Sequence, residues 1–167
     1  EVAHTIPVLS LDKCYSPEEL LAWLTKTVAA ASVGDPLSFV LEEKLDGASI
    51  VLTYEEGRLV RAVTRGNGSV GNDVTANART IRSIPLVLTE AVSLTVRGEV
   101  FMRRAAFEAY NTASGGTYSN PRNLAAGTLR NVRSRITAAV PLDFFAYEGF
   151  FADGWGETHS GILGRLV

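Results

Sequence analysis

One lysine in this chain stands where an amine could act as a reagent. Lys44 follows Glu42, precedes Asp46 and Gly47, and adjoins an apolar run that starts at Ala48. A free lysine titrates near 10.4, so roughly one amine in a few thousand is neutral at pH 7. A nucleophilic lysine therefore needs desolvation or neighbouring cations to raise its neutral fraction.

Spacing alone leaves two interpretations of Lys44 open. We expect partial burial at the end of a strand, and Arg65 after the next hairpin could supply a cation. The carboxylates of Glu42 and Asp46 would oppose this by holding the proton on the amine. A metal ion that neutralises Asp46 or Glu99 would resolve the conflict. The alternative, which spacing alone favours, is a surface lysine paired with Glu42 or Asp46.

The elements that must position this lysine begin with a helix over residues 16–31. Ser16 is a suitable N-cap, Pro17 fits the first turn, and Glu19 completes a capping box. Apolar residues recur there at helical spacing. The sequence Gly34-Asp35-Pro36 should end the segment.

Strands are predicted before and after the lysine in the sequence. Residues 37–43 are predicted to form one strand, which would place Glu42 and Lys44 on the same face. Residues 48–54 and 58–63 are predicted to form a hairpin closed by Glu55-Glu56-Gly57.

Further along the chain, residues 93–102 are predicted to form a strand with Thr95, Arg97 and Glu99 on one face, and residues 142–150 another. Residues 64–72 are rich in glycine and asparagine and should form a loop with positive φ angles. The remaining predictions are a short helix capped by Asp73 through Ile81, and helices at 104–112 and through 124–130. An antiparallel hairpin among helices indicates the α+β class.

The amino-acid composition limits the partners and the cellular compartment to be expected for this chain. The net charge of −2 does not by itself indicate a nucleic-acid partner. A content of 46% hydrophobic residues is typical of a globular protein with a core. Cys14 is the single cysteine, so no internal disulfide or cysteine cluster can form. No apolar run reaches membrane-spanning length, and the start does not resemble a signal peptide. We expect a reducing cytoplasmic setting and a chain cut from something longer.

Several motifs occur in a distinctive order. Lys44-Leu45-Asp46-Gly47 matches the K-x-D-G signature of covalent nucleotidyltransferases, and Arg65-Gly66 follows after the hairpin. The later motifs are Arg97-Gly98-Glu99 and the run from Ser119 to Arg130, SNPRNLAAGTLR. Together with Pro7-Val8-Leu9-Ser10-Leu11-Asp12 upstream, the whole chain resembles the adenylation domain of bacterial NAD-dependent DNA ligases.

That resemblance implies a covalent nucleotidyltransferase fold, with antiparallel sheets flanked by helices. It implies that Lys44 attacks the adenylyl phosphorus of NAD and expels nicotinamide mononucleotide. The resulting lysine–AMP would then adenylate the 5′-phosphate of a nick in double-stranded DNA, which the 3′-hydroxyl seals in replication and repair. It also implies Mg²⁺ or Mn²⁺, and zinc in a part of the parent protein outside these residues.

The resemblance also implies roles for individual residues. Asp46 would assist the catalytic steps and Glu42 would accept a hydrogen bond from the adenine amino group. Ser10 and Leu11 would line the adenine pocket. The other expected contacts are Arg65 with the nucleotide, Glu99 with the ribose hydroxyls, and Arg122 and Arg130 with DNA or the departing mononucleotide. Each has a plainer alternative: Glu99 paired with Arg97, Arg130 ending a helix, Asn120 serving as an N-cap.

The chain departs from the family pattern. Asn67 and Asn72 replace two acidic residues of the glycine-rich loop, and Lys13 stands where the family often has Asn. Residues 1–167 are expected to be a partial adenylation domain, with a leading segment and helix at 1–35 and a core at 36–167 that lacks its C-terminal strands. Residues 1–167 by themselves are expected to be inactive. The protein is expected to be a monomer, and the longer protein from which these residues come is expected to associate with the nucleoid. The alternatives are an ATP-dependent ligase or capping relative, and a non-catalytic ligase-like binding module.

Overall fold

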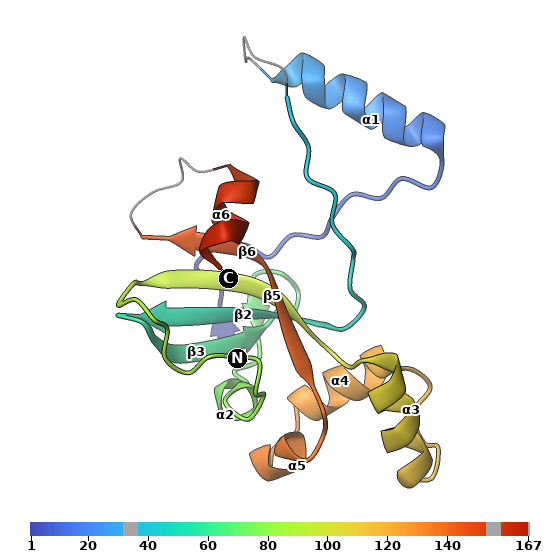
Figure 1. The fold of residues 1–167 in the computed structure, drawn as a ribbon, viewed down its shortest axis with the longest axis vertical. Coiled ribbons are helices and arrows are strands. Elements are labelled where there is room, and N and C mark those ends of the chain that lie inside the picture. Colours follow the sequence, from blue (N-terminus) through green and yellow to red (C-terminus); the bar gives the residue numbers. More distant parts are fainter. Residues whose placement is uncertain (32–36, 153–157, 167) are drawn as a thin grey trace. The chain divides into compact units, whose positions relative to one another are not determined.

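The structure is a computed structural model that describes residues 1–31, 37–152 and 158–166. The chain divides into two compact units. The sheet unit comprises Glu1–Val8 and Lys44–Val167, and the helix unit comprises Leu9–Glu43. We describe each unit by itself (Figure 1).

A four-stranded antiparallel sheet forms the centre of the sheet unit. Its strand order is β3-β2-β5-β6, with β2 at Ala48–Glu55, β3 at Arg58–Thr64, β5 at Leu94–Phe101 and β6 at Asp143–Phe151. A second, two-stranded sheet pairs β1 (Val2–Ala3) with β4 (Val70–Gly71). The α+β class and the predicted hairpin are therefore confirmed.

The two central residues of the hairpin turn adopt backbone angles that such a tight turn requires. Glu56 and Gly57 both have positive φ angles, of 47° and 75°. A two-residue loop of this kind matches the right-handed twist of the strands that it joins. Glycine adopts such angles at no steric cost, which accounts for Gly57.

Short helices cover parts of the sheet. α4 (Pro121–Leu129) packs against β2 and β5, α2 (Thr75–Ala78) packs against β3 and α5 (Ser134–Ala138), and α6 (His159–Arg165) packs against β6. α3 occupies Arg104–Ala113, close to the predicted range. None of the described helices has the length and apolar character required to span a bilayer.

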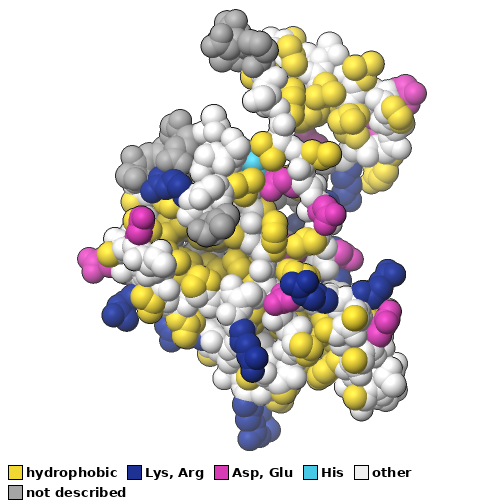
Figure 2. All heavy atoms as spheres, viewed as in Figure 1, with side chains coloured by type: hydrophobic (Ala, Val, Ile, Leu, Met, Phe, Trp, Pro, Cys, Tyr) yellow, Lys and Arg dark blue, Asp and Glu magenta, His cyan; other side chains and the backbone are white. Residues whose placement is uncertain are grey.

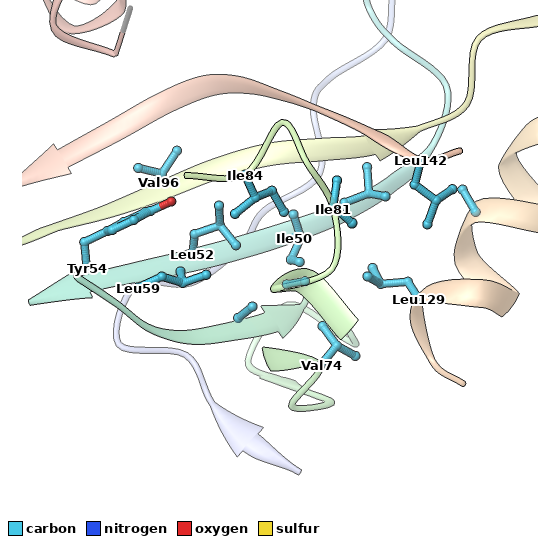
Figure 3. Packing of buried hydrophobic residues seen from close by; sticks show 14 of the residues in the cluster. Ile50, Leu52, Tyr54, Leu59, Val74, Ile81, Ile84, Val96, Leu129 and Leu142 are labelled. Carbon is cyan, nitrogen blue, oxygen red and sulfur yellow. The ribbon is translucent and has the colours of Figure 1, made fainter. Parts of the chain in front are cut away.

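The hydrophobic core lies between the sheet and these helices. Figure 3 shows Ile50 and Leu52 of β2 pointing toward Ile81 and Ile84, with Val96 of β5 beside them. The predicted alternation of β5 is confirmed, since Leu94, Val96 and Val100 all join this core. Tyr54 is buried as well, and its hydroxyl donates a hydrogen bond to the carbonyl oxygen of Pro85 at 2.8 Å. Burial raises the pKa of Tyr54 to about 12.

The helix unit contains α1, at Pro17–Ala30. Ser16 is its N-cap, as predicted, and accepts a hydrogen bond from the backbone N–H of Glu19. The carboxylate of Glu19 reaches back and accepts from the N–H of Tyr15, one residue earlier than in a standard capping box. Large apolar side chains of α1 remain exposed, as the yellow surface over this helix shows in Figure 2. The predicted stop at residues 34–36 lies outside the described residues.

Two sequence predictions are wrong in detail. Residues 37–43 form no strand, and Leu41 is 99% exposed. An apolar run becomes a strand only when a neighbouring strand hydrogen-bonds to it, and pairing with β5 begins at Ala48. The predicted helix at residues 73–81 shrinks to α2, because Thr80 and Ile81 already donate to the carbonyls three residues before them, as in isolated turns.

Candidate active site

The K-x-D-G turn leads directly into β2. Lys44 and Asp46 are exposed, whereas Gly47 is buried where the strand begins. The expected partial burial of Lys44 at the end of a strand is therefore wrong: the amine precedes the sheet and faces solvent. Exposure here leaves Lys44 accessible to a dissolved substrate.

Gly47 holds the turn against β5. Its N–H donates to Oε1 of Glu99 at 3.1 Å. A Cβ at this position would overlap the carbonyl oxygen of Val100 and approach the side chain of Glu99. The glycine of the motif is thus required by the close approach of two backbones.

Glu99 is a buried carboxylate with two donors. Besides the N–H of Gly47, the hydroxyl of Ser49 donates to Oε2 at 2.9 Å. Burial raises the pKa of Glu99 above its ordinary value, and the two hydrogen bonds and the charges of Lys44 and Arg122 oppose that rise. The positive charges of Lys44 and Arg122 therefore both act on the same buried carboxylate.

Arg122 connects α4 to the K-x-D-G turn. Its Nη1 lies 2.8 Å from Oδ1 of Asp46, and both side chains are largely exposed. The side chain of Asn120 caps α4 by accepting from the N–H of Asn123, and Pro121 occupies the first turn. The structure thus gathers Lys44, Asp46, Glu99 and Arg122 around one end of β2.

Arg65 belongs to the glycine-rich loop that follows β3. Its side chain is exposed, and its backbone N–H donates to the carbonyl oxygen of Ser49 at 3.1 Å. Gly66 and Gly68 have the positive φ angles predicted for this loop. Asn67 accepts from the N–H groups of two loop residues, Ser69 at 3.0 Å and Val70 at 2.9 Å. An amide oxygen therefore performs the structural task that an aspartate would perform here.

Arg130 lies at the other end of α4 from Arg122. It is the C-cap, and its Nε donates to the carbonyl oxygen of Ala126 at 3.2 Å. This agrees with the plainer expectation of a helix-ending arginine. Arg130 also lines a cavity of about 310 Å³, together with Asn72, Asp73 and Asn131.

The remaining predicted residues, Ser10, Leu11 and Glu42, belong to the helix unit. Ser10 and Leu11 are exposed in an irregular segment, and Glu42 is exposed within the segment wrongly predicted as a strand. Their roles around adenine stay predictions.

Two residues of this region, Ser49 and Tyr147, were not predicted, and Arg97 has a partner other than the one considered. Ser49 is the one hydroxyl residue between Ala48 and Leu52, a signal that sequence inspection could have used. Tyr147 occupies the irregular register between Arg97 and Gly98, and burial, then the charge of Glu99, raise its pKa. Arg97 does not take Glu99 as its partner, since its Nη1 lies 2.7 Å from Oε2 of Glu148.

Comparison with known proteins agrees with this arrangement. Residues 1–166 match the family described as NAD-dependent DNA ligase adenylation domain. The chain is 48% identical to a DNA ligase of Borrelia turicatae over 99% of its own length and 25% of that protein. It is 47% identical to a DNA ligase of Leptospira interrogans, covering 98% of the chain and 23% of that protein. For a DNA ligase of Xanthomonas euvesicatoria the identity is 49%, over 99% of the chain and 21% of that protein. The chain thus spans about a quarter of the length of these relatives, and it belongs to the NAD-dependent DNA ligase adenylation domain family.

Proposed function

We propose that Lys44 becomes covalently adenylated by NAD, and that the natural protein carrying this chain uses the adenylate to seal nicks in DNA. The observation that carries the proposal is the neighbourhood of Lys44. The exposed amine of Lys44 and the guanidinium of Arg122 both act electrostatically on the buried carboxylate of Glu99, and Arg122 also pairs with Asp46 of the lysine turn. Family membership supports NAD as the AMP donor over ATP.

The covalent step exchanges a P–O bond of NAD for a P–N bond to the protein. The neutral amine of Lys44 donates its electron pair to the adenylyl phosphorus of NAD and forms a P–N bond. The P–O bond to the mononucleotide breaks, and its electron pair leaves with the nicotinamide mononucleotide phosphate. The surplus proton of the amine passes to solvent, to which Lys44 is exposed. The AMP is then transferred to the 5′-phosphate of a nick, and attack by the 3′-hydroxyl releases it.

Glu99 is suited to hold the ribose of the adenylate. Each carboxylate oxygen has two lone pairs, and the N–H of Gly47 and the hydroxyl of Ser49 occupy one on each oxygen. The remaining lone pairs can accept from vicinal hydroxyl groups. Because protein donors already fix the carboxylate, its orientation costs little when the ribose arrives.

The basic side chains are suited to phosphate. Arg122 offers a planar fork, and the Nη1 donor that binds Asp46 can also serve a phosphate oxygen. We propose that Arg65 contacts the nucleotide, and that Arg122 and Arg130 contact DNA or the departing mononucleotide. We further propose that Ser10, Leu11 and Glu42 surround the adenine, and that Asp46 assists the transfer steps.

A divalent metal belongs to the reaction that the family name implies. Among the described residues, no three His, Cys, Asp or Glu side chains lie together as a metal cage. Asp46 is engaged by Arg122, and Glu99 by Gly47 and Ser49. These residues therefore do not form a site that could hold Mg²⁺ or Mn²⁺ by protein side chains alone. A single cysteine cannot form a cysteine-based zinc site. The zinc that the resemblance implies is expected in other parts of the natural protein.

We propose the same wider setting as for a bacterial ligase: a monomer in the cytoplasm, at the nucleoid, with nicked double-stranded DNA as its partner. Residues 1–35 would be the leading part of an adenylation domain and residues 36–167 part of its core. Since relatives named DNA ligase are about four times as long, we do not expect residues 1–167 alone to seal nicks. A non-catalytic ligase-like module is the second candidate, because Asn67 and Asn72 replace acidic residues.

One experiment distinguishes these proposals. The natural protein is incubated with NAD or ATP, digested, and its peptides are searched by mass spectrometry for added AMP. We expect the label with NAD alone, and on Lys44 rather than on Lys13 or Lys26. Lys44→Arg should abolish labelling, whereas Lys26→Arg, also at an exposed position, should retain it. A label on another lysine would contradict the role of Lys44, and no label with wild type would favour the non-catalytic candidate.

A further inference from the structure

The N-terminal residues run along the glycine-rich loop that carries Arg65. We call residues 2–8 the strap. β1 pairs with β4, the N–H of His4 donates to the carbonyl oxygen of Ser69 at 2.8 Å, and the N–H of Val8 donates to that of Gly68 at 2.8 Å. The strap is therefore hydrogen-bonded to the loop at both of its ends.

His4 connects the strap to the backbone on either side of the Arg65 amide. Its Nε2 lies 3.1 Å from the carbonyl oxygen of Thr64 and 3.2 Å from that of Arg65. Both oxygens can only accept, so Nε2 must carry the hydrogen and donate to them. The partly buried imidazole thus restrains the peptide planes from which the Arg65 side chain departs.

Arg97 fixes the other end of the strap to the sheet. Its Nη2 donates to the carbonyl oxygen of Pro7 at 2.7 Å, while Nη1 pairs with Glu148 and the guanidinium lies over the ring of Phe150 at 4.6 Å. Only 13% of this side chain is exposed. Arg97 stands two residues before Glu99 on β5, so it ties the strap to the strand that carries the buried carboxylate.

The loop fits closely under the strap. Gly68 has φ of 97°, and a Cβ there would stand 2.9 Å from the carbonyl oxygen of Val8. Glycine is therefore favoured at position 68 for two reasons, the positive φ angle and the close approach of the strap backbone. Such contact leaves the loop little freedom while the strap is in place.

We propose that His4 and Arg97 are positioning residues that, through the strap, hold Arg65 in the direction from which it contacts the nucleotide. The proposal rests on the proposed function only through the role of Arg65. Both residues act on the backbone: His4 on that of the loop, Arg97 on that of the strap. A small misplacement of a binding group can cost a large factor in rate or affinity, and each lost hydrogen bond loosens the loop.

Hydrogen–deuterium exchange in the natural protein tests the mechanical part without any activity. In His4→Ala, amides of residues 64–71 should exchange roughly tenfold faster, as expected when about 1.4 kcal/mol of local restraint is lost. Thr5→Ala, at an exposed position of the same strap, should leave their exchange unchanged. Amides of the β2–β5 ladder serve as the control for global unfolding. Arg97→Lys should give a smaller increase, and it replaces His4→Ala if that variant does not fold.

Labelling of Lys44 tests the functional part. In His4→Ala the NAD concentration for half-maximal labelling should rise roughly tenfold, with the maximal rate changed less. His4→Gln, whose side-chain amide can donate to the same carbonyls, should restore much of the loss. His4→Ala and Arg65→Ala should be non-additive together, because both act through Arg65.

The outcomes separate the two proposals. Unchanged exchange in His4→Ala overturns the strap proposal whatever the enzyme does. Faster exchange with unchanged labelling, or additive effects of the two variants, also overturns it. Faster exchange in a protein whose wild type is never labelled supports the restraint of the loop and contradicts the proposed function instead.

Discussion

Arg122 and Asp46 form an ion pair of 2.8 Å across 76 residues of sequence. The arginine comes from the first turn of α4 and the aspartate from the turn before β2. Neither motif alone specifies the contact, which arises because α4 packs against β2 and β5. The pair makes the distant N-P-R-N and K-x-D-G motifs parts of one surface.

Breaking this ion pair should impair function much more than stability. The side chains of Arg122 and Asp46 are 54% and 72% exposed, and exposed pairs typically contribute about 0–1 kcal/mol. We therefore expect Arg122→Ala to change the free energy of unfolding by less than about 1 kcal/mol. AMP transfer to nicked DNA should fall at least about tenfold, the loss expected from removing a charged hydrogen-bond donor. Urea unfolding and a transfer assay with the natural protein measure the two effects.

Arg103→Ala is the matched control for that variant. It breaks another ion pair of 2.8 Å, to Asp143, in which the arginine is 75% exposed. Its effect on unfolding should be similar, and transfer should remain normal. Equal losses of transfer in both variants would contradict a specific role for Arg122.

Replacing Gly47 with alanine should disturb the lysine turn itself. The new Cβ would overlap the carbonyl oxygen of Val100, which is backbone and cannot rotate away. We expect a loss of about 1–3 kcal/mol in unfolding free energy, and loss of Lys44 labelling. Gly127→Ala is the control, since a Cβ there meets nothing within 4 Å. In the interior of α4 it should be neutral or stabilising by up to about 1 kcal/mol. A Gly47→Ala protein as stable as wild type would show that the backbones can separate.

The side-chain oxygen of Asn67 should stabilise the loop, and it should make no difference whether that oxygen belongs to a neutral amide or to a carboxylate. Asn67→Ala removes the acceptor of the N–H groups of Ser69 and Val70. We expect it to cost about 1–2 kcal/mol and to accelerate amide exchange in the loop. Asn67→Asp keeps an oxygen in the same place and should match wild type in both measurements. A loss in the aspartate variant equal to that in the alanine variant would contradict this account.

Local patterns predicted the local elements well. The caps of α1 and α4 depend on side chains next to the helix start, and the alternation in β5 depends on the period of two that any strand has. The strand predicted at residues 37–43 was wrong because pairing is a property of the neighbouring chain rather than of the run itself.

The candidate site was predictable as motifs but not as contacts. The sequence identifies Lys44, Asp46 and Glu99, yet the donation from Ser49 to Glu99 depends on the register of β2 against β5, which pairs these two residues. The irregularity that admits Tyr147 beside Glu99 is likewise a property of the paired strands. Such long-range register is fixed by the packed core and cannot be read from spacing along one strand.

Glu99→Gln should change how stability depends on pH. Burial raises the pKa of Glu99, so between its unfolded value of roughly 4.3 and its higher folded value the folded state binds more protons than the unfolded state. The contribution of Glu99 to stability is therefore full below the unfolded pKa and is lost as pH rises through the folded pKa. Glutamine removes this dependence, and its amide can still accept from Gly47 and donate to Ser49. We expect the variant to be at least as stable as wild type at pH 7, with a flatter slope of unfolding free energy above pH 4, while Lys44 labelling weakens. Glu108→Gln, which removes a carboxylate at an exposed position of α3, should retain the wild-type slope. Urea unfolding at several pH values measures the slope for wild type and both variants. Identical slopes for wild type and Glu99→Gln would contradict the conclusion that Glu99 titrates as a buried carboxylate.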